Sequence, residues 1–264
     1  MDDPFAAYKE MQRRNWSTFA PLEAFTAGPA ARLVHYAGIR AGERVLDVAC
    51  GTGVVGLTAA RRGALVSGLD LTPELLTRAR ENARIAGVEI EFVEGDCESL
   101  PFADASFDAV LSQFGHIFAP RSDVALAEML RVLKRGGTIA LATWPPETYI
   151  GRTFELVSRY LPPPPGAIPP TRWGERDAIV TWFGNSLRDV TFERATSFAP
   201  ALSPQHQRLS QESSVGVVTK IVELLRDDPA GLAQFRREYE ALGAEYFAEN
   251  RISLEYLLVR AVKA

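Results

Sequence analysis

Three acidic residues of this chain stand where a side chain could bind a ligand. Asp47, Asp70 and Asp96 each lie at or near the end of a short apolar run that is typical of a buried strand. Ligands of open α/β sheets bind beyond the carboxyl ends of the strands, so side chains at these ends meet at one site. Carboxylates accept hydrogen bonds from hydroxyl and amine groups, and their charge favours a cationic ligand. The pattern predicts a site for a polar, positively charged molecule.

A glycine-rich turn follows the first of these acids. Gly51, Gly53 and Gly56 have the spacing of a dinucleotide-binding turn, in which glycine allows tight backbone geometry and close packing of a helix on a strand. The same spacing fits an NAD-linked oxidoreductase, which is one alternative. Asp47 argues against NAD, because a carboxylate beneath the turn is a poor neighbour for a pyrophosphate. The chain also has no Tyr-x-x-x-Lys pair, which would supply the catalysis of such an enzyme.

The stretch from Val45 to Gly53, Val-Leu-Asp-Val-Ala-Cys-Gly-Thr-Gly, resembles the class I S-adenosylmethionine (SAM)-dependent methyltransferases. It looks closest to the ubiquinone- and menaquinone-biosynthesis type and its small-molecule relatives. Ala49 stands where many members carry a glycine, but that subgroup commonly has Ala-Cys-Gly-Thr-Gly. The resemblance implies SAM as cofactor and S-adenosylhomocysteine (SAH) as product. It also implies that the turn binds the cofactor through Asp47, Ala49, Gly51, Thr52 and Gly53.

Asp70 is the candidate for binding the cofactor ribose. It follows Gly51 at close to the spacing of about 20 residues expected for such an acid, and its two oxygens can accept both hydroxyl protons. The alternative is a turn or helix-capping aspartate, although Thr72 and Pro73 already provide a cap and a first helical residue. Leu71 is expected to lie against the adenine.

Asp96 and Cys97 are expected, by the resemblance, to bind the adenine. Asp96 would accept a hydrogen bond from the exocyclic amine, and the Cys97 backbone N–H would donate to a ring nitrogen. The alternative for Asp96 is an Asx turn that only shapes the loop. Cys97 is not expected to be a nucleophile, since no nearby residue in the sequence would activate its thiol.

The segment from Gln113 to Phe118 follows the fourth predicted strand and should face both the methyl group and the acceptor. Gln113 is expected to contact the cofactor. His116 could act as a general base, since its unperturbed pKa is about 6.5, or it could pack in the wall of the pocket. The segment lacks the Asn/Asp-Pro-Pro-aromatic signature of nucleic-acid amino-methyltransferases.

The N-terminal segment 1–29 is expected, by the resemblance, to cover the cofactor. Trp16 is taken as its contact residue, with ordinary core packing as the alternative. Pro21 and Pro29 are expected to interrupt its helical pattern. The other candidates for this cover are Tyr8, Arg13 and Arg14.

The elements that would position these residues alternate between strands and helices as far as residue 145. Helices are predicted at 54–62, 73–86 and 122–134, the last one stopped by Gly136-Gly137. Strands are predicted at 65–70, 90–94, 109–112 and 138–143, and the apolar run at 45–48 adds another. The fold class is therefore α/β. The resemblance implies a Rossmann-like, seven-stranded, mostly parallel sheet with one antiparallel edge strand and helices on both faces.

The remaining residues differ in composition and are expected to form a lid. Segment 146–186 contains the run Pro162–Pro165, which suits a rigid flap or, alternatively, a partner-binding segment. Segment 200–251 is mainly helical and separates two further predicted strands. One methyltransferase domain is thus expected over 1–264. Its SAM-binding core is 30–145 with 187–199 and 252–264, and its lid is 146–186 and 200–251.

Composition limits the partners and the compartment. The chain has 264 residues, a net charge of −4 and 47% hydrophobic residues, so no basic surface for nucleic acid is indicated. No run is long and apolar enough for a membrane span, and the acidic N-terminus predicts no signal peptide. The two cysteines show no metal-ligand spacing, and no metal is expected. We expect a cytoplasmic protein, either a monomer or a homodimer.

The expected reaction is transfer of the SAM methyl group to a small molecule. Alignment and exclusion of water can supply most of the catalysis, because the leaving group is a neutral thioether. The aromatic residues of the lid segment 146–186 suggest an aromatic or apolar acceptor. A second alternative is a SAM-binding protein that does not methylate, such as a scaffold or a cofactor-held cyclase.

Overall fold

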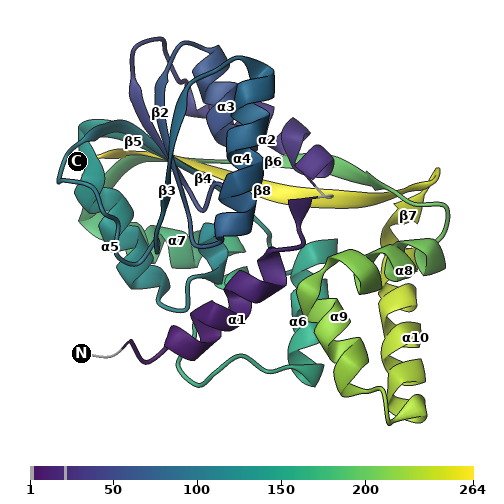
Figure 1. Ribbon diagram of the computed structural model, residues 1–264. Coiled ribbons are helices and arrows are strands. Elements are labelled where there is room, and N and C mark those ends of the chain that lie inside the picture. Colours follow the sequence, from purple (N-terminus) through teal and green to yellow (C-terminus); the bar gives the residue numbers. More distant parts are fainter. Residues whose placement is uncertain (1–2, 21–22) are drawn as a thin grey trace.

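An eight-stranded sheet forms the centre of the computed structural model, which describes residues 3–20 and 23–264 (Figure 1). The strand order is β3-β2-β1-β4-β5-β8-β6, and the two-residue β7 pairs with β8. The strands are β1 (Arg44–Val48), β2 (Leu65–Asp70), β3 (Ile90–Glu94), β4 (Phe107–Gln113), β5 (Leu133–Thr143), β6 (Leu187–Pro200), β7 (Phe247–Ala248) and β8 (Arg251–Lys263). The sheet confirms the predicted mixed α/β fold.

The strand order reverses between β1 and β4, which both run parallel to their neighbours. This is the topological switch point, where α/β sheets bind ligands. The antiparallel strand is β8, which pairs with both β5 and β6. The antiparallel pairing thus lies at the β6 edge of the sheet, as predicted, with β6 as the outermost strand.

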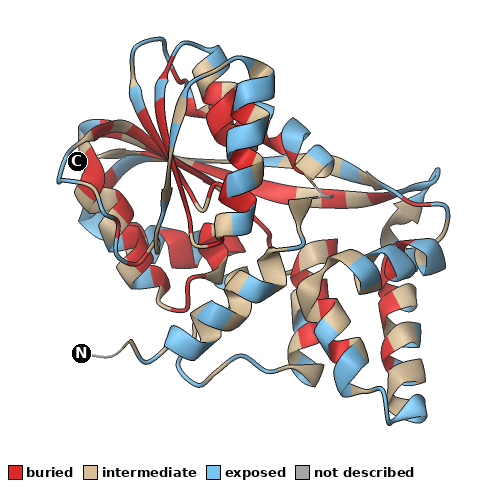
Figure 2. Ribbon diagram, in the orientation of Figure 1, coloured by how far each residue is buried: buried red, intermediate tan, exposed pale blue. Residues whose placement is uncertain are grey.

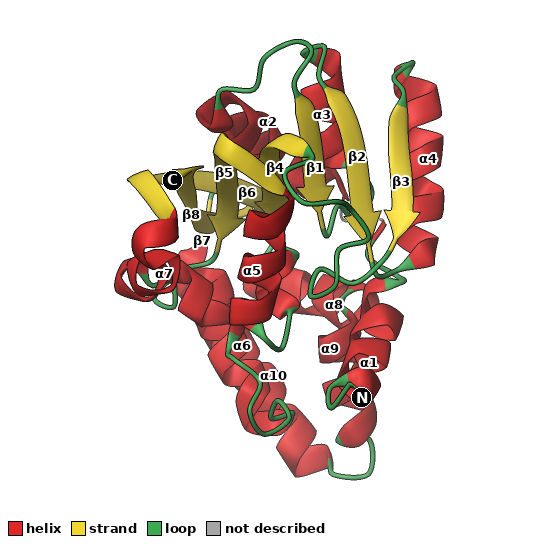
Figure 3. Cartoon of the chain, turned by 90° about the vertical axis from the view of Figure 1, so that its left-hand side faces the viewer, coloured by secondary structure: helices red, strands yellow, loops and turns green. Residues whose placement is uncertain are grey.

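Helices cover both faces of this sheet. Helices α2, α3 and α4 lie on one face and α5 on the other, while α7 packs with β6 (Figure 3). The bounds are α2 (Glu23–Ala37), α3 (Val54–Arg61), α4 (Pro73–Ala86), α5 (Ser122–Val132) and α7 (Arg176–Phe183). The central strands are buried on both sides, as continuous apolar runs of parallel strands require (Figure 2).

Helices α5 and α2 differ from the sequence prediction. Helix α5 ends at Val132, and β5 begins at Leu133, before the expected start at Thr138, because Leu133 already pairs with Phe107 of β4. Gly137 allows this close pairing, since a Cβ there would lie 2.8 Å from the Asp108 carbonyl oxygen. Helix α2 continues through Pro29 without a break. The expected break at Pro21 lies outside the described residues, as do residues 1–2 of the predicted N-terminal cover.

A second layer of helices lies beyond the carboxyl ends of the parallel strands (Figure 1). It consists of α1 (Ala6–Trp16), α6 (Tyr149–Tyr160), α8 (Pro204–Ser214), α9 (Gly216–Leu224) and α10 (Pro229–Tyr246). Helix α10 packs against α6 and α8, and α9 packs against α1 and α6. None of the helices in the described ranges has the length and apolar character needed to cross a bilayer.

Candidate functional site

A cavity of about 460 Å³ lies between the sheet and the second helical layer. Its sheet half is lined by the loops that follow β1, β2, β3 and β4 and by residues of α1. Its helical half is lined by residues of α6, α8, α9 and α10. The cavity thus lies at the switch point of the sheet, where the binding residues were predicted from the sequence.

All but one of the residues expected to contact the cofactor line the sheet half. These are Trp16, Asp47, Ala49, Gly51, Thr52, Asp70, Leu71, Asp96, Cys97 and Gln113. Gly53 is the exception. It caps the start of α3 with a φ of +84°, and a Cβ there would come within 3.2 Å of the Phe92 ring. Gly53 therefore shapes the turn without facing the cavity.

The turn after β1 follows an unusual backbone path. Gly51 and Ala49 have positive φ values of 55° and 53°, a region that costs a residue with a Cβ roughly 1–2 kcal/mol. Gly115 from the loop after β4 packs directly on this turn, since a Cβ there would lie 2.5 Å from the Ala49 Cβ. The two loops thereby approach closely enough to form one wall of the cavity.

Asp47 is the most strongly perturbed acid of the site. Its side chain is 1% exposed, and its Oδ2 accepts a hydrogen bond from the Gly56 N–H at 2.9 Å. Its Oδ1 is buried and has no hydrogen-bond partner among the described residues. Burial raises the pKa of Asp47 to about 8, and the nearby charge of Asp70 adds to this. A cationic ligand would stabilise the ionised carboxylate, so the site fits the charge that SAM would bring.

Asp70 makes the backbone contacts of the turn aspartate that the sequence left open as the alternative to its ribose-binding role. Its Oδ2 accepts the Gly51 N–H and its Oδ1 accepts the Thr72 N–H, both at 2.8 Å. The carboxylate lines the cavity, and burial raises its pKa. An ionised carboxylate has about four acceptor positions. Asp70 can therefore organise the turn and still accept hydrogen bonds from a ligand.

Asp96 shows the Asx turn that the sequence left open as its alternative role. Its Oδ1 accepts the Glu98 N–H at 2.9 Å, and its Oδ2 accepts from Lys9 Nζ at 2.6 Å. Cys97 lines the cavity beside it. Burial and the charges of Asp96 and Glu98 raise the pKa of the Cys97 thiol, so the thiol stays protonated.

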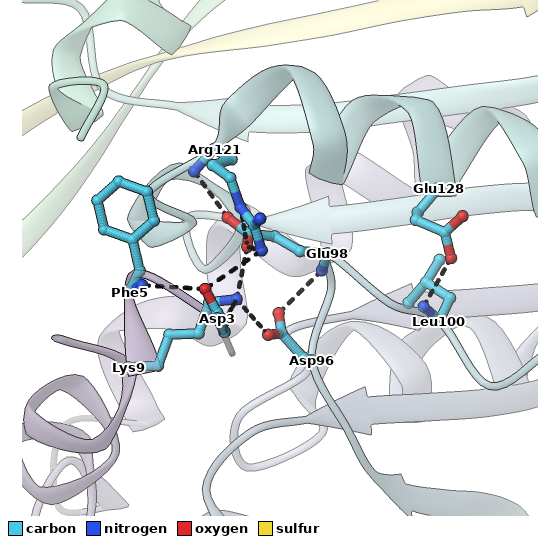
Figure 4. A network of polar contacts seen from close by, with 8 residues as sticks. All are labelled: Asp3, Phe5, Lys9, Asp96, Glu98, Leu100, Arg121 and Glu128. Atoms are coloured by element: carbon cyan, nitrogen blue, oxygen red, sulfur yellow. Dashed lines mark hydrogen bonds and ion pairs between the residues drawn. The ribbon is translucent and has the colours of Figure 1, made fainter. Parts of the chain in front are cut away.

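Lys9 ties helix α1 to this loop (Figure 4). Its Nζ lies 2.6 Å from carboxylate oxygens of Asp3 and Asp96 and 2.5 Å from Glu98. Glu98 also accepts from Arg121 at 2.7 Å. Burial alone would lower the pKa of Lys9, but the hydrogen bonds that its ammonium donates to the three carboxylates raise it. The three acids converge closely enough to surround a cation, and the ammonium of Lys9 is that cation.

Gln113 and Trp16 complete the sheet half. Gln113 Nε2 donates to the Thr26 carbonyl at 2.9 Å, while its buried Oε1 has no partner in the described ranges. The ring centroids of Trp16 and Phe118 lie 4.8 Å apart, and the indole N–H of Trp16 donates to Gln12 Oε1 at 3.2 Å. Of the other N-terminal candidates, Arg13 lines the cavity, whereas Arg14 is exposed and bonds to Glu10, and Tyr8 is not part of the lining.

His116 is the site residue for which the structure favours the packing alternative that the sequence left open. It is fully buried, its Nδ1 lies 3.0 Å from Ser112 Oγ, and its ring packs edge-on against Trp173. It does not line the cavity. Burial lowers the pKa of His116 to about 3, so the ring is neutral at ordinary pH. A neutral ring outside the cavity cannot reach an acceptor, which favours the packing role over the general base.

The helical half contains residues that the sequence did not single out. Tyr149, Gln207 and Tyr239 are buried and line the cavity from three different helices. Each lies in a segment without a recognisable motif, and their meeting depends on how α6, α8 and α10 pack. Only the abundance of aromatic residues in 145–186 pointed towards this region.

This chain is similar to known proteins in three comparisons: one with protein families, one with protein sequences and one with solved structures. Residues 45–137 match a protein family described as a methyltransferase domain. An uncharacterised protein of Mycobacterium tuberculosis is 37% identical over 233 residues, which cover 88% of this chain and 85% of that protein. The demethylmenaquinone methyltransferase of Thermus thermophilus is 41% identical over 117 residues, which cover 44% of this chain and 53% of the relative.

The fold comparison agrees with these sequence matches. A structure of Haemonchus contortus phosphoethanolamine N-methyltransferase 2, in complex with SAH and phosphomonomethylethanolamine, superposes with a TM-score of 0.57 at 19% identity. The match covers 89% of this chain and 52% of that chain. At this identity the likeness concerns the fold.

Proposed function

The chain belongs to the class I SAM-dependent methyltransferases, and we propose that its acceptor is a small molecule bound in the helical half of the cavity. The observation that carries this proposal is the single cavity that joins the acid-lined turns of the sheet to the apolar walls of α6, α9 and α10. Such a cavity can hold a donor and an acceptor side by side. Enclosure by helices suits an acceptor of limited size and not a polymer.

We further propose that the sheet half holds SAM through the acids at the strand ends. The unpartnered Oδ1 of Asp47 and Oε1 of Gln113 offer acceptor atoms to a cationic amino-acid group. Asp70 and Leu71 both line the cavity, where Asp70 would accept hydrogen bonds from a ribose and Leu71 would contact a base. In this proposal the backbone N–H of Cys97 and the carboxylate of Asp96 would recognise the adenine, and Lys9, which already donates to Asp96, would compete for that carboxylate.

When bound, SAM supplies an activated methyl group on a sulfonium that leaves as a neutral thioether. The task of the protein is then to align the acceptor with that methyl group and to keep water out. Trp16, Phe118 and Phe154 line the cavity as consecutive aromatic contacts, with centroid distances of 4.8 and 5.7 Å. This aromatic wall leads from the sheet half into the helical half. It would orient a flat acceptor and exclude water around it.

The relative from Thermus thermophilus supports an apolar acceptor, since its name identifies demethylmenaquinone as the compound it methylates. That match covers less than half of this chain, and the helical half is built mainly from residues after 145. We therefore propose an apolar small molecule as the acceptor class and no particular compound.

Incorporation of labelled methyl groups tests this function. The protein is incubated with SAM labelled in the methyl group and with a small-molecule extract of cells, and a parallel sample receives a protein extract. We expect label to enter the small-molecule fraction, with SAH formed in equal amount. Label found in macromolecules would contradict the proposed acceptor class. Tight SAM binding without any SAH formation would favour the non-methylating alternative.

A further inference from the structure

Three buried polar side chains meet in the helical half of the cavity. Tyr149 begins α6, Gln207 lies in α8 and Tyr239 lies in α10, and they are 2%, 5% and 2% exposed. All three line the cavity. They come together because α10 packs against both α6 and α8.

Two of these side chains lack the partners that buried polar groups normally have. The hydroxyl of Tyr149 and Oε1 of Gln207 are buried and make no hydrogen bond within the described part of the chain. Native proteins pair most such groups, and the exceptions need an explanation. Burial raises the pKa of Tyr149 to about 12, against the opposing effect of the neighbouring Tyr239, Thr153 and Gln207 side chains, so its hydroxyl keeps its proton and can donate. A donor and an acceptor thus lie in the cavity lining without a hydrogen-bond partner among the described residues.

The surroundings of this pair are neutral. Among the described residues, the charged side chains that line the cavity are Lys9, Arg13, Asp47, Asp70 and Asp96, which lie in α1, in the strands β1 and β2 or in the loop after β3. The lining residues from α6, α8, α9 and α10 carry no charge. A charged acceptor group placed among them would lose its hydration without gaining a partner. The helical half therefore selects against charged acceptors.

We propose that Tyr149, Gln207 and Tyr239 form a subsite that binds a hydroxyl group of a neutral, ring-containing methyl acceptor. The inference rests on the proposed function, because it places the acceptor in the helical half. A hydroxyl satisfies both unused groups, since it accepts from Tyr149 and donates to Gln207 Oε1. A carbonyl oxygen would leave Gln207 unpaired. Tyr239 adjoins the pair and can contribute a further hydroxyl contact.

The preference for a ring-containing acceptor follows from the aromatic and aliphatic side chains that line the cavity. Phe118 and Phe154 face the cavity and contact each other edge-to-face at 5.7 Å, and Val157, Val218 and Leu254 add aliphatic surface. Flat apolar molecules bury the most area against such walls. The hydroxyl then fixes which end of the ring enters first.

Binding of three naphthalene probes tests the subsite. 2-Naphthol, naphthalene and 2-naphthoate share one ring system and differ in a hydroxyl, nothing or a charge. Their affinities are measured by tryptophan fluorescence with the protein saturated in SAH. We expect 2-naphthol to bind about three- to tenfold more tightly than naphthalene, the effect of one or two neutral hydrogen bonds, and 2-naphthoate to bind most weakly.

Variants assign that preference to the named residues. Tyr149→Phe and Gln207→Leu remove one polar group each with little change in volume, and each should reduce the preference for 2-naphthol at least threefold while leaving naphthalene affinity unchanged. Tyr160→Phe is the matched control, since Tyr160 lies on the same helix, packs on Phe235 and does not line the cavity. Unchanged SAH affinity shows that each variant is folded.

The outcomes separate the subsite from the proposed function. Equal binding of 2-naphthol and naphthalene, absence of binding by both, strongest binding of 2-naphthoate, or an unchanged preference in both variants would overturn the subsite while SAH still binds. Failure of the wild-type protein to bind SAH, measured separately by calorimetry, would overturn the proposed function and the subsite with it.

Discussion

Asp47 is the residue whose ionisation should report most directly on the state of the site. Its carboxyl is buried, one oxygen has no hydrogen-bond partner in the described part of the chain, and its pKa is raised to about 8. Most of its population is therefore protonated at pH 7 in the free protein. A buried acid in this condition is costly to ionise unless a cation arrives.

Stability should depend on pH through this residue. The unfolded pKa of Asp47 is near 3.8 and the folded pKa is about 8, so between these values the folded state binds the extra proton. Stability then falls as the pH rises through that window. Relative to Asp47→Asn, the wild-type protein should lose on the order of 1–3 kcal/mol between pH 5 and pH 9. Urea unfolding of both proteins across this range measures it, and parallel curves would contradict the assignment.

The same residue predicts release of a proton when SAM binds. A cation beside Asp47 lowers its pKa, so at pH 7 the protonated carboxyl should ionise on binding. Calorimetry in buffers of different ionisation enthalpy should show release of up to about one proton by the wild-type protein. Asp47→Asn should show much less. Equal proton release by both proteins would mean that another group titrates.

Substitution of His116 should lower the stability of the protein without lowering its methyl-transfer activity. Substitution of this residue by asparagine opens space beside Trp173 and removes a buried contact, at a cost of about 1–3 kcal/mol. Methyl transfer should remain within a few-fold of wild type at a temperature where the variant is folded. A fall of 100-fold or more, the size typical of a lost general base, would restore the catalytic role.

At the scale of elements, helix α1 is held over the sheet half by one lysine, Lys9, whose side chain is 11% exposed. Lys9 contacts carboxylates of Asp3, Asp96 and Glu98, and the same helix carries Trp16 into the cavity. None of the residues of α1 is fully buried. The helix therefore depends on this ion cluster more than on apolar packing.

Removing the ammonium should loosen α1 locally. In Lys9→Met, hydrogen exchange of residues 6–16 should accelerate several-fold, and SAM affinity should fall by about tenfold, because Asp3, Asp96 and Glu98 lose the ammonium and only Arg121 remains as a cation beside Asp3 and Glu98. Arg14→Met is the control, since Arg14 is exposed on the same helix and pairs only with Glu10 among its described contacts. Similar exchange in both variants would show that Lys9 is not the main contact.

At the scale of the whole molecule, the sheet and its loops were predictable because their signals are local. Each strand of the parallel part is a short apolar run, and Gly53 and Gly87 mark helix ends through backbone conformations that glycine favours. The strand order follows from the family resemblance. The positions of Asp47, Asp70 and Asp96 around one cavity then follow from the shared edge of parallel strands.

The helical half was not predictable in the same way. Tyr149, Gln207 and Tyr239 are far apart in the sequence and meet only through the packing of three helices. The role of His116 was open for a similar reason, because its neighbour Trp173 comes from a distant segment. The start of β5 at Leu133 depended on pairing with Phe107, which the apolar pattern alone does not reveal.

The most direct test of the account is the SAM affinity of variants at Asp70, measured by calorimetry. Asp70→Asn keeps the volume of the side chain, and Asp227→Ala, on an exposed turn, serves as the control. We predict that Asp70→Asn, shown to be folded by its circular dichroism, binds SAM about 100-fold more weakly than wild type, the size expected for lost hydrogen bonds to a charged group. Binding within twofold of wild type by the folded variant would contradict the claim that the acids at the strand ends bind the methyl donor.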